Sequence, residues 1–130
     1  MLKINSNEYK VLNSEIKYVN ATHNAIKGYS ILVSLDIELN NVKGYVSFYV
    51  DFFRKKDFKN IINKKYIEIP TKLDSKITMI EIFDTKNFVD FIDSEVNLEF
   101  GEIDNNQIKM ILSINDELIK LEYQGLLNIK

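Results

Sequence analysis

The sequence predicts a mainly β protein: an antiparallel barrel or two-sheet sandwich of about eight strands, with two short helices. Two observations predict this fold class. Apolar and polar residues alternate over long stretches of the 130-residue chain, which is typical of strands buried on one face. Turns rich in Asn and Asp separate these stretches at hairpin spacing. The alternative is an α+β roll with both helices packed on one sheet.

A hairpin in the first half of the chain is the clearest predicted element. Apolar residues occupy every second position from Tyr29 to Leu39 and again from Val42 to Phe52. Asn40-Asn41 between them fits a two-residue turn, because Asn tolerates the positive φ angles that such turns need. The register that this turn sets places Val33 opposite Phe48, so the same face of both strands is buried.

A second antiparallel unit is predicted in the C-terminal third. Residues 95–127 alternate in three runs, which predicts a three-stranded meander. The alternation loses its phase near Gly101, so we expect a β-bulge there. A tight turn at Asn115-Asp116 would join the last two strands and set Lys109 opposite Glu122.

The N-terminal region predicts one further strand. Residues 8–20 carry apolar residues in mixed phase, which indicates a strand with a bulge. We expect residues 20–25 to form a loop that exposes His23, the only histidine of the chain.

Two segments break the strand period and predict short helices. In Asp57 to Lys65, apolar residues recur at helical spacing, and Asp57 is a good N-cap. In Thr85 to Ser94, the same spacing recurs. Each segment is long enough for about two turns.

Composition excludes several classes of function. The chain has no cysteine, 17 Lys and Arg against 19 Asp and Glu, and a net charge of -2. Disulfides and thiol catalysis are therefore excluded, and neither a zinc site with nitrogen or sulfur ligands nor a catalytic triad can form without His23. We expect a single domain over residues 1–130 that is not an enzyme and that carries no cofactor and no metal. Without an apolar leader or an 18-residue apolar span, we expect a cytoplasmic protein with no membrane contact.

The strongest local charge asymmetry lies in the first predicted helix and its flanks, between Phe53 and Tyr66. Basic side chains there could contact an acidic partner, although on a helix of this kind they could also serve only to solvate its outer face. The near-neutral net charge argues against nucleic acid as the partner. Acidic residues gather in 74–104, so the two segments could also pair between two copies in a homodimer. The candidate partner-binding residues of the basic helix are Arg54, Lys55, Lys56, Lys59, Lys64 and Lys65.

A second candidate binding surface is the polar face of the predicted hairpin. Tyr45 and Tyr49 lie on this face among serine and carboxylate residues. Such a surface suits recognition, because tyrosine offers a large contact area at low entropic cost. The alternative is that another element covers the face and that both tyrosines pack in the interior.

Three functional hypotheses follow. The first is a non-enzymatic interaction module, such as an inhibitor, an immunity-type protein or an adaptor, because charge asymmetry occurs without catalytic motifs. The second is a β-barrel carrier of a small apolar ligand, which resembles the lipocalin and fatty-acid-binding class only in architecture. The third is an enzyme that uses carboxylates and His23, and it has no positive support in the sequence.

Overall fold

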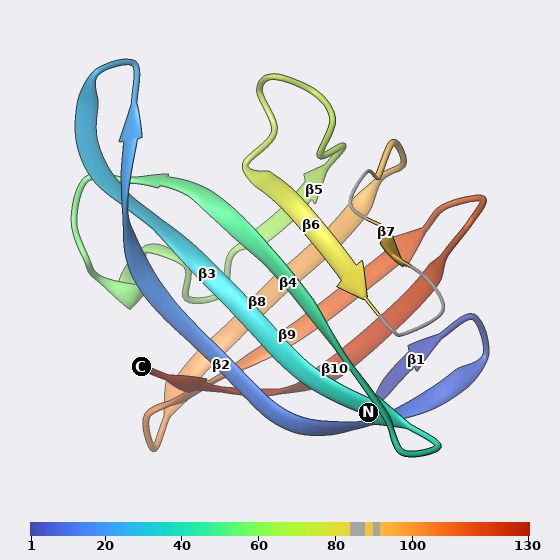
Figure 1. Cartoon of the computed structure of the whole chain (residues 1–130). Helices are drawn as coiled ribbons and strands as arrows, with labels where there is room; N and C mark the ends of the chain where they lie inside the picture. Colours follow the sequence, from blue (N-terminus) through green and yellow to red (C-terminus); the bar gives the residue numbers. More distant parts are fainter. Residues whose placement is uncertain (84–87, 90–91) are drawn as a thin grey trace.

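Ten β-strands form one sheet in the computed structural model, which describes residues 1–83, 88–89 and 92–130. The strands span Leu2–Ile4 (β1), Asn7–His23 (β2), Ile26–Leu39 (β3), Val42–Phe53 (β4), Lys65–Glu68 (β5), Ile77–Phe83 (β6), Phe88–Val89 (β7), Val96–Asp104 (β8), Gln107–Asn115 (β9) and Lys120–Ile129 (β10). Their order across the sheet is β5-β8-β9-β10-β1-β2-β3-β4-β6-β7. The sheet curls into a half barrel, so that β2, β3, β4 and β6 cross in front of β8, β9 and β10 (Figure 1).

The mainly β, antiparallel class is therefore confirmed, but the prediction is wrong about the architecture, the number of strands and the two helices. One curled sheet replaces a closed barrel or two separate sheets. The described residues form ten strands rather than about eight, because β1 and β7 are only 3 and 2 residues long. Strands this short show no alternation that a sequence pattern could reveal.

The hairpin of β3 and β4 has the predicted register. Val33 lies opposite Phe48, and Asn40 and Asn41 adopt φ angles of 52° and 66° in the turn. The prediction fails at one position, where Asp51 and Phe52 together oppose a single residue of β3. This bulge turns Phe52 away from the buried face, so Phe53 pairs with Tyr29 in its place.

The predicted C-terminal meander of β8, β9 and β10 is confirmed, including the register shift beside Gly101. The predicted pairing of Lys109 with Glu122 is wrong, because Lys109 lies opposite Leu126. Residues 116–119 form a longer loop than expected, and the Asp116 N–H donates to the carbonyl of Ile119 at 2.9 Å. The loop has four residues instead of two and begins one residue later, which shifts the register of the whole hairpin.

The N-terminal strand is longer than predicted. β2 has the expected bulge, between Val11 and Asn13. It continues to His23, so most of the expected loop at 20–25 is strand and only Asn24 and Ala25 form the turn. β1 lies between β2 and the first half of β10, and the end of β10 then runs parallel to β2.

The two predicted helices are wrong. In the first segment, only Phe58–Asn60 forms a 3-10 turn, although Asp57 caps it as expected by accepting from the Lys59 N–H at 2.9 Å. The chain leaves the helical path because Ile61 is fully buried and the Lys64 carbonyl accepts from the Phe100 N–H of β8.

Much of the second segment, Thr85 to Ser94, lies outside the described residues, and Phe88–Val89 within it pairs with β6 as strand β7. The alternative α+β roll needs two helices packed on a sheet, and the described residues contain no such helix.

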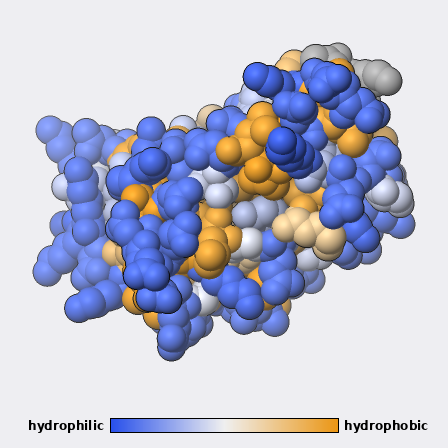
Figure 2. All heavy atoms as spheres, turned by 90° about the horizontal axis from the view of Figure 1, so that it is seen from below, coloured by the Kyte–Doolittle hydropathy of each residue, from blue (hydrophilic) through white to orange (hydrophobic). Residues whose placement is uncertain are grey.

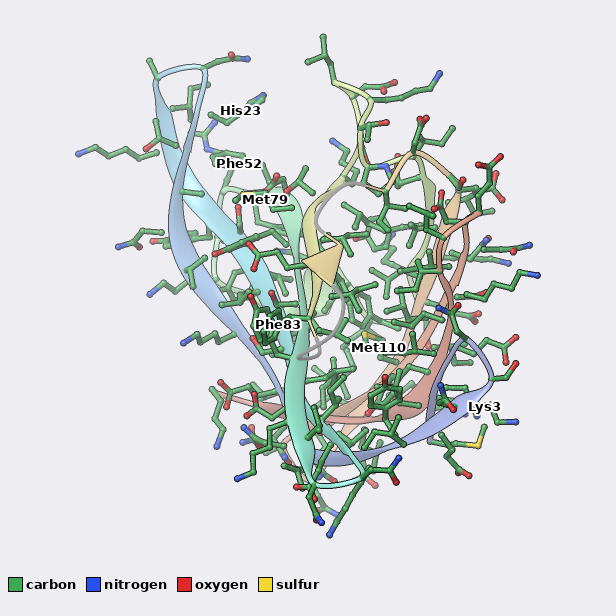
Figure 3. All side chains as sticks on the ribbon, turned by 45° about the vertical axis from the view of Figure 1, so that its right-hand side comes forward. Lys3, His23, Phe52, Met79, Phe83 and Met110 are labelled. Atoms are coloured by element: carbon green, nitrogen blue, oxygen red, sulfur yellow. The ribbon has the colours of Figure 1, made fainter. Side chains whose placement is uncertain are left out.

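Apolar side chains from both halves of the sheet meet in the interior. Phe48 of β4 and Phe100 of β8 are each 1% exposed, and Ile61 joins them from the loop after β4. Met110 of β9 lies between the two halves (Figure 3). Seen from below, the surface is mostly hydrophilic, and apolar residues reach it in the middle of that face (Figure 2). No helix in the described part of the chain is long and apolar enough to cross a membrane.

Candidate functional site

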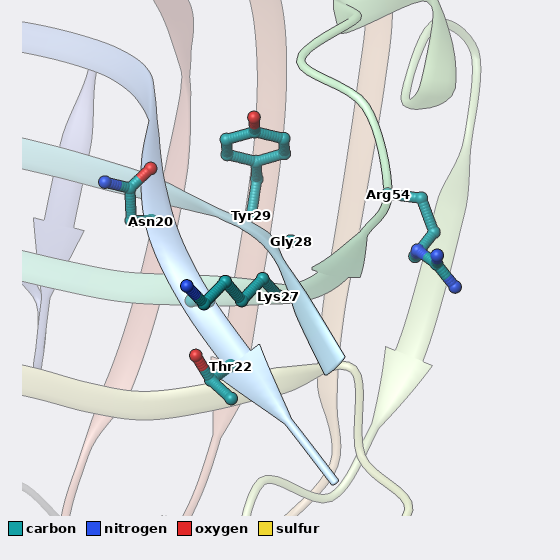
Figure 4. A pocket seen from close by; sticks show the side chains of 7 residues that line it. Asn20, Thr22, Lys27, Gly28, Tyr29 and Arg54 are labelled. Carbon is teal, nitrogen blue, oxygen red and sulfur yellow. The ribbon is translucent and has the colours of Figure 1, made fainter. Parts of the chain in front are cut away.

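A hollow of about 510 Å³ lies at the tip of the hairpin that joins β2 and β3, and we call it the hairpin hollow. Figure 4 shows its polar side chains on the two strands, with Arg54 across from them on the loop after β4. It is lined by Asn20, Ala21, Thr22, Lys27, Gly28, Tyr29 and Arg54.

The alternation of the two strands explains why this hollow is polar. Tyr18 of β2 lies opposite the fully buried Ile31 of β3, on the inner face of the sheet. Two residues further, Asn20 lies opposite Tyr29, and then Thr22 lies opposite Lys27. Side chains two apart on a strand share a face, so the inner face continues beyond the core as a polar surface.

An aromatic cluster holds the loop after β4 against this inner face. The Tyr18 ring lies 6.2 Å from Tyr29, 5.9 Å from Phe53 and 4.7 Å from Phe58, measured between ring centroids. The Tyr18 hydroxyl donates to the Asp57 carbonyl at 2.5 Å. Burial of this hydroxyl raises the pKa of Tyr18. Residues 54–64, which we call the basic loop, are thus attached to the sheet although only Phe58–Asn60 is helical, as a 3-10 turn.

The structure brings some of the predicted basic residues to the hollow. All six are exposed, but only Arg54 lines the hollow, and the Lys56 ammonium lies 5.1 Å from the centre of the Tyr29 ring. Lys64 directly precedes β5, and Lys65 begins this strand and lies opposite Glu99 of β8. The structure does not gather them with Arg54. Lys55 and Lys59 lie on the exposed part of the basic loop.

Lys27 is the functional candidate that the sequence reasoning missed. The sequence pattern predicted that this strand begins at Tyr29, whereas β3 begins at Ile26 and therefore includes Lys27. The sequence did carry a signal for Lys27, because the alternation of the inner face continues into polar residues at the ends of both strands. Among the residues that the structure describes, none forms an ion pair with Lys27, Arg54 or Lys56.

Tyr45 and Tyr49 lie on the outer face of the sheet, as predicted, and they line one hollow of about 350 Å³. Its other walls come from β3 and β6, and we call it the tyrosine trough. The Tyr45 ring stacks on Phe83 with 5.6 Å between centroids, and its hydroxyl donates to Glu81 Oε2 at 3.0 Å. This hydrogen bond raises the pKa of Tyr45. The trough is lined by Leu32, Ser34, Asp36, Tyr45, Val46, Ser47, Tyr49, Met79 and Glu81.

A β-bulge in β6 shapes one end of the trough. Ser47 lies opposite Glu81 and Tyr49 opposite Thr78, so two residues of β6 oppose Phe48 alone. One of the two, Met79, has a φ of 53° and is 64% exposed. The bulge directs the Met79 side chain to the outer surface beside the trough (Figure 3).

The carboxylate of Asp51 fixes the three strands beside the trough. Ser30 of β3 and Thr78 of β6 donate to its two oxygens, the latter at 2.8 Å. Ser30 is 5% exposed, so this carboxylate satisfies a buried hydroxyl. Asp51 therefore serves the structure of the outer face.

The neighbours of His23 in the described part of the chain are Asn24 and Phe52. His23 is exposed at the end of β2, its Nε2 lies 3.3 Å from the Asn24 side-chain nitrogen, and its ring lies 5.7 Å from Phe52 (Figure 3). Throughout residues 1–83, 88–89 and 92–130, no three His, Asp or Glu side chains are placed to hold a metal ion.

No protein-family model, curated protein or solved structure matches this chain.

Proposed function

We propose that the protein is a small, non-enzymatic interaction module of the inhibitor, immunity-type or adaptor kind, and that it binds an acidic segment of a partner protein. One observation carries this proposal: Lys27, Arg54 and Lys56 are gathered around the hairpin hollow with no ion pair among the described residues. Cations that form no ion pair with the described residues are available to a partner.

The geometry suits an acidic protein segment. Exposed cations attract an acidic partner and accelerate its encounter, while the hollow limits which segments fit. Lys27 stands on a strand, and the basic loop that carries Arg54 is attached through Tyr18. Little backbone entropy is therefore lost on binding. The net charge of -2 continues to argue against nucleic acid.

The carrier hypothesis has no comparable support. A carrier needs an apolar cavity, whereas the hairpin hollow is lined by Asn, Thr, Lys and Arg side chains and the tyrosine trough lies on the outer face. We extend the proposal to a cytoplasmic location, because a chain without cysteine needs no oxidising compartment to fold.

A glutamate-rich peptide, titrated against the isotope-labelled protein by NMR, tests the proposal. We expect amide shifts at the tip of the β2–β3 hairpin and in the basic loop. Combined replacement of Lys27, Arg54 and Lys56 by glutamate should weaken binding about tenfold, since each exposed pair contributes only a fraction of a kcal/mol to about 1 kcal/mol.

The matched control makes the same change in net charge elsewhere. It replaces Lys72, Lys109 and Lys120, which are all exposed and lie outside the hairpin hollow, by glutamate. An equal loss of binding in the control would contradict the proposal, because the peptide would then be responding to net charge alone.

A further inference from the structure

The tyrosine trough has a floor of small side chains and two aromatic walls. Ser34 and Ser47 lie opposite each other in the register of β3 and β4 and form the floor. Tyr45 and Tyr49 stand on either side of Ser47 on the same face of β4. Their Cα atoms are about 13 Å apart along the strand, at about 3.3 Å per residue, which leaves room for a side chain between them.

Two carboxylates give the trough a negative charge. Asp36 lies opposite Tyr45, and Glu81 lies opposite Ser47. The Tyr45 hydroxyl donates to Oε2 of Glu81, so the other oxygen of this carboxylate keeps its full acceptor capacity. The described residues that line the trough include no lysine or arginine.

Met79 and Leu32 supply an apolar wall on the same trough. Met79 is 64% exposed, and its exposure results from the bulge in β6. A thioether adapts to varied shapes and suits contact with an aliphatic stem. The trough therefore combines aromatic faces, an apolar wall and two acceptor carboxylates within about 350 Å³.

We propose that the tyrosine trough is a second binding site, and that it takes an arginine side chain from a basic segment of a partner protein. The guanidinium stacks on a tyrosine ring and donates to Glu81 or Asp36 while its stem packs on Met79. Arginine fits better than lysine because its planar head both stacks and donates in a fork. This site is opposite in charge to the hairpin hollow and does not depend on it.

A short peptide of alternating arginine and glycine, titrated by NMR, tests this proposal. We expect amide shifts on β3, β4 and β6 around the trough. Glu81→Gln keeps an acceptor for Tyr45 but removes the charge, and it should weaken binding about fivefold. Tyr49→Ala removes one wall and should weaken binding about threefold. Glu122→Gln, an exposed carboxylate change on β10, is the matched control and should leave binding unchanged.

Three results would overturn the proposal. The same peptide with citrulline in place of arginine could bind equally well, which would show that the positive charge is not recognised. Glu122→Gln could weaken binding as much as Glu81→Gln, which would reduce the effect to diffuse electrostatics. The free protein could form a dimer that Glu81→Gln dissociates, which would make a second copy the occupant. Arg54→Glu should leave peptide binding intact, which separates this site from the hairpin hollow.

Discussion

The hairpin hollow and the tyrosine trough lie on opposite faces of the same strand. β3 gives Lys27 and Tyr29 to the inner hollow, and a few residues later it gives Ser34 and Asp36 to the outer trough. The first surface is basic and the second is acidic. The comparison teaches that strand alternation alone can place two surfaces of opposite charge on one strand, provided that the apolar core ends before the hairpin does.

The largest effect should come from the core that both surfaces share. Phe48 is 1% exposed and lies beneath the trough, between Ser47 and Tyr49 in the chain. Phe48→Ala should lower the free energy of unfolding by about 4 kcal/mol through lost burial and a cavity. Denaturant unfolding measures this change, and Tyr49→Ala on the outer face is the control, with a cost below about 1 kcal/mol. Equal costs would show that the outer face is as deeply packed as the core.

A change at Gly28 should separate the two surfaces. An added Cβ would come within 2.3 Å of the Phe52 ring and 2.5 Å of the Phe53 carbonyl oxygen. Gly28→Ala should therefore cost about 2 kcal/mol and distort the hairpin hollow, while the trough keeps its NMR spectrum. Gly101→Ala is the control, because its Cβ would meet only the Lys109 side chain, at 3.2 Å. Similar costs at both glycines would refute the close approach at the hairpin tip.

The attachment of the basic loop can be tested through one hydroxyl. Tyr18→Phe keeps the aromatic cluster but removes the hydrogen bonds of the Tyr18 hydroxyl with the Asp57 carbonyl and the Asn60 side chain. It should cost about 1 kcal/mol and speed hydrogen exchange in the basic loop without changing the trough. Tyr66→Phe is the control, since its half-buried hydroxyl has no hydrogen-bond partner among the described residues. Unchanged exchange after Tyr18→Phe would show that the rings alone hold the loop.

The tyrosine trough could be predicted from the sequence more fully than the hairpin hollow. Alternation and the Asn40-Asn41 turn fixed the register of β3 and β4, and this register placed Tyr45 and Tyr49 on one face. What the pattern could not supply was the third strand. β6 contributes Glu81 and Met79 through a bulge and a pairing distant in sequence, which no local pattern encodes.

The sequence pattern did not predict the hairpin hollow, because tertiary contacts there override the local spacing of apolar residues. Phe58 and Ile61 have helical spacing, yet Phe58 packs on Tyr18 and Ile61 enters the core from an open loop. The bulge at Asp51 likewise exchanged Phe52 for Phe53 on the inner face. Helix propensity over two turns is too weak to resist such packing.

The smallest predicted effect is a change in pKa that should occur at a tyrosine of one surface and not at a tyrosine of the other. The pKa values of Tyr18 and Tyr45 are both raised, but burial is the main cause for Tyr18 and the hydrogen bond to Glu81 is the main cause for Tyr45. A raised pKa favours the protonated phenol in the folded state. The stability linked to it is therefore complete below the ordinary tyrosine pKa, and it is lost as the pH rises through the folded-state value.

Glu81→Gln should lower the pKa of Tyr45 towards its ordinary value, because the negative charge beside the phenol is removed. The pKa of Tyr18 should not change, since it is raised mainly by burial of the hydroxyl on the other face of the sheet. A titration of ring-labelled tyrosine by NMR resolves the two residues. A shift of both pKa values would mean that the two faces are coupled through β3, and the two surfaces could then not act as independent sites.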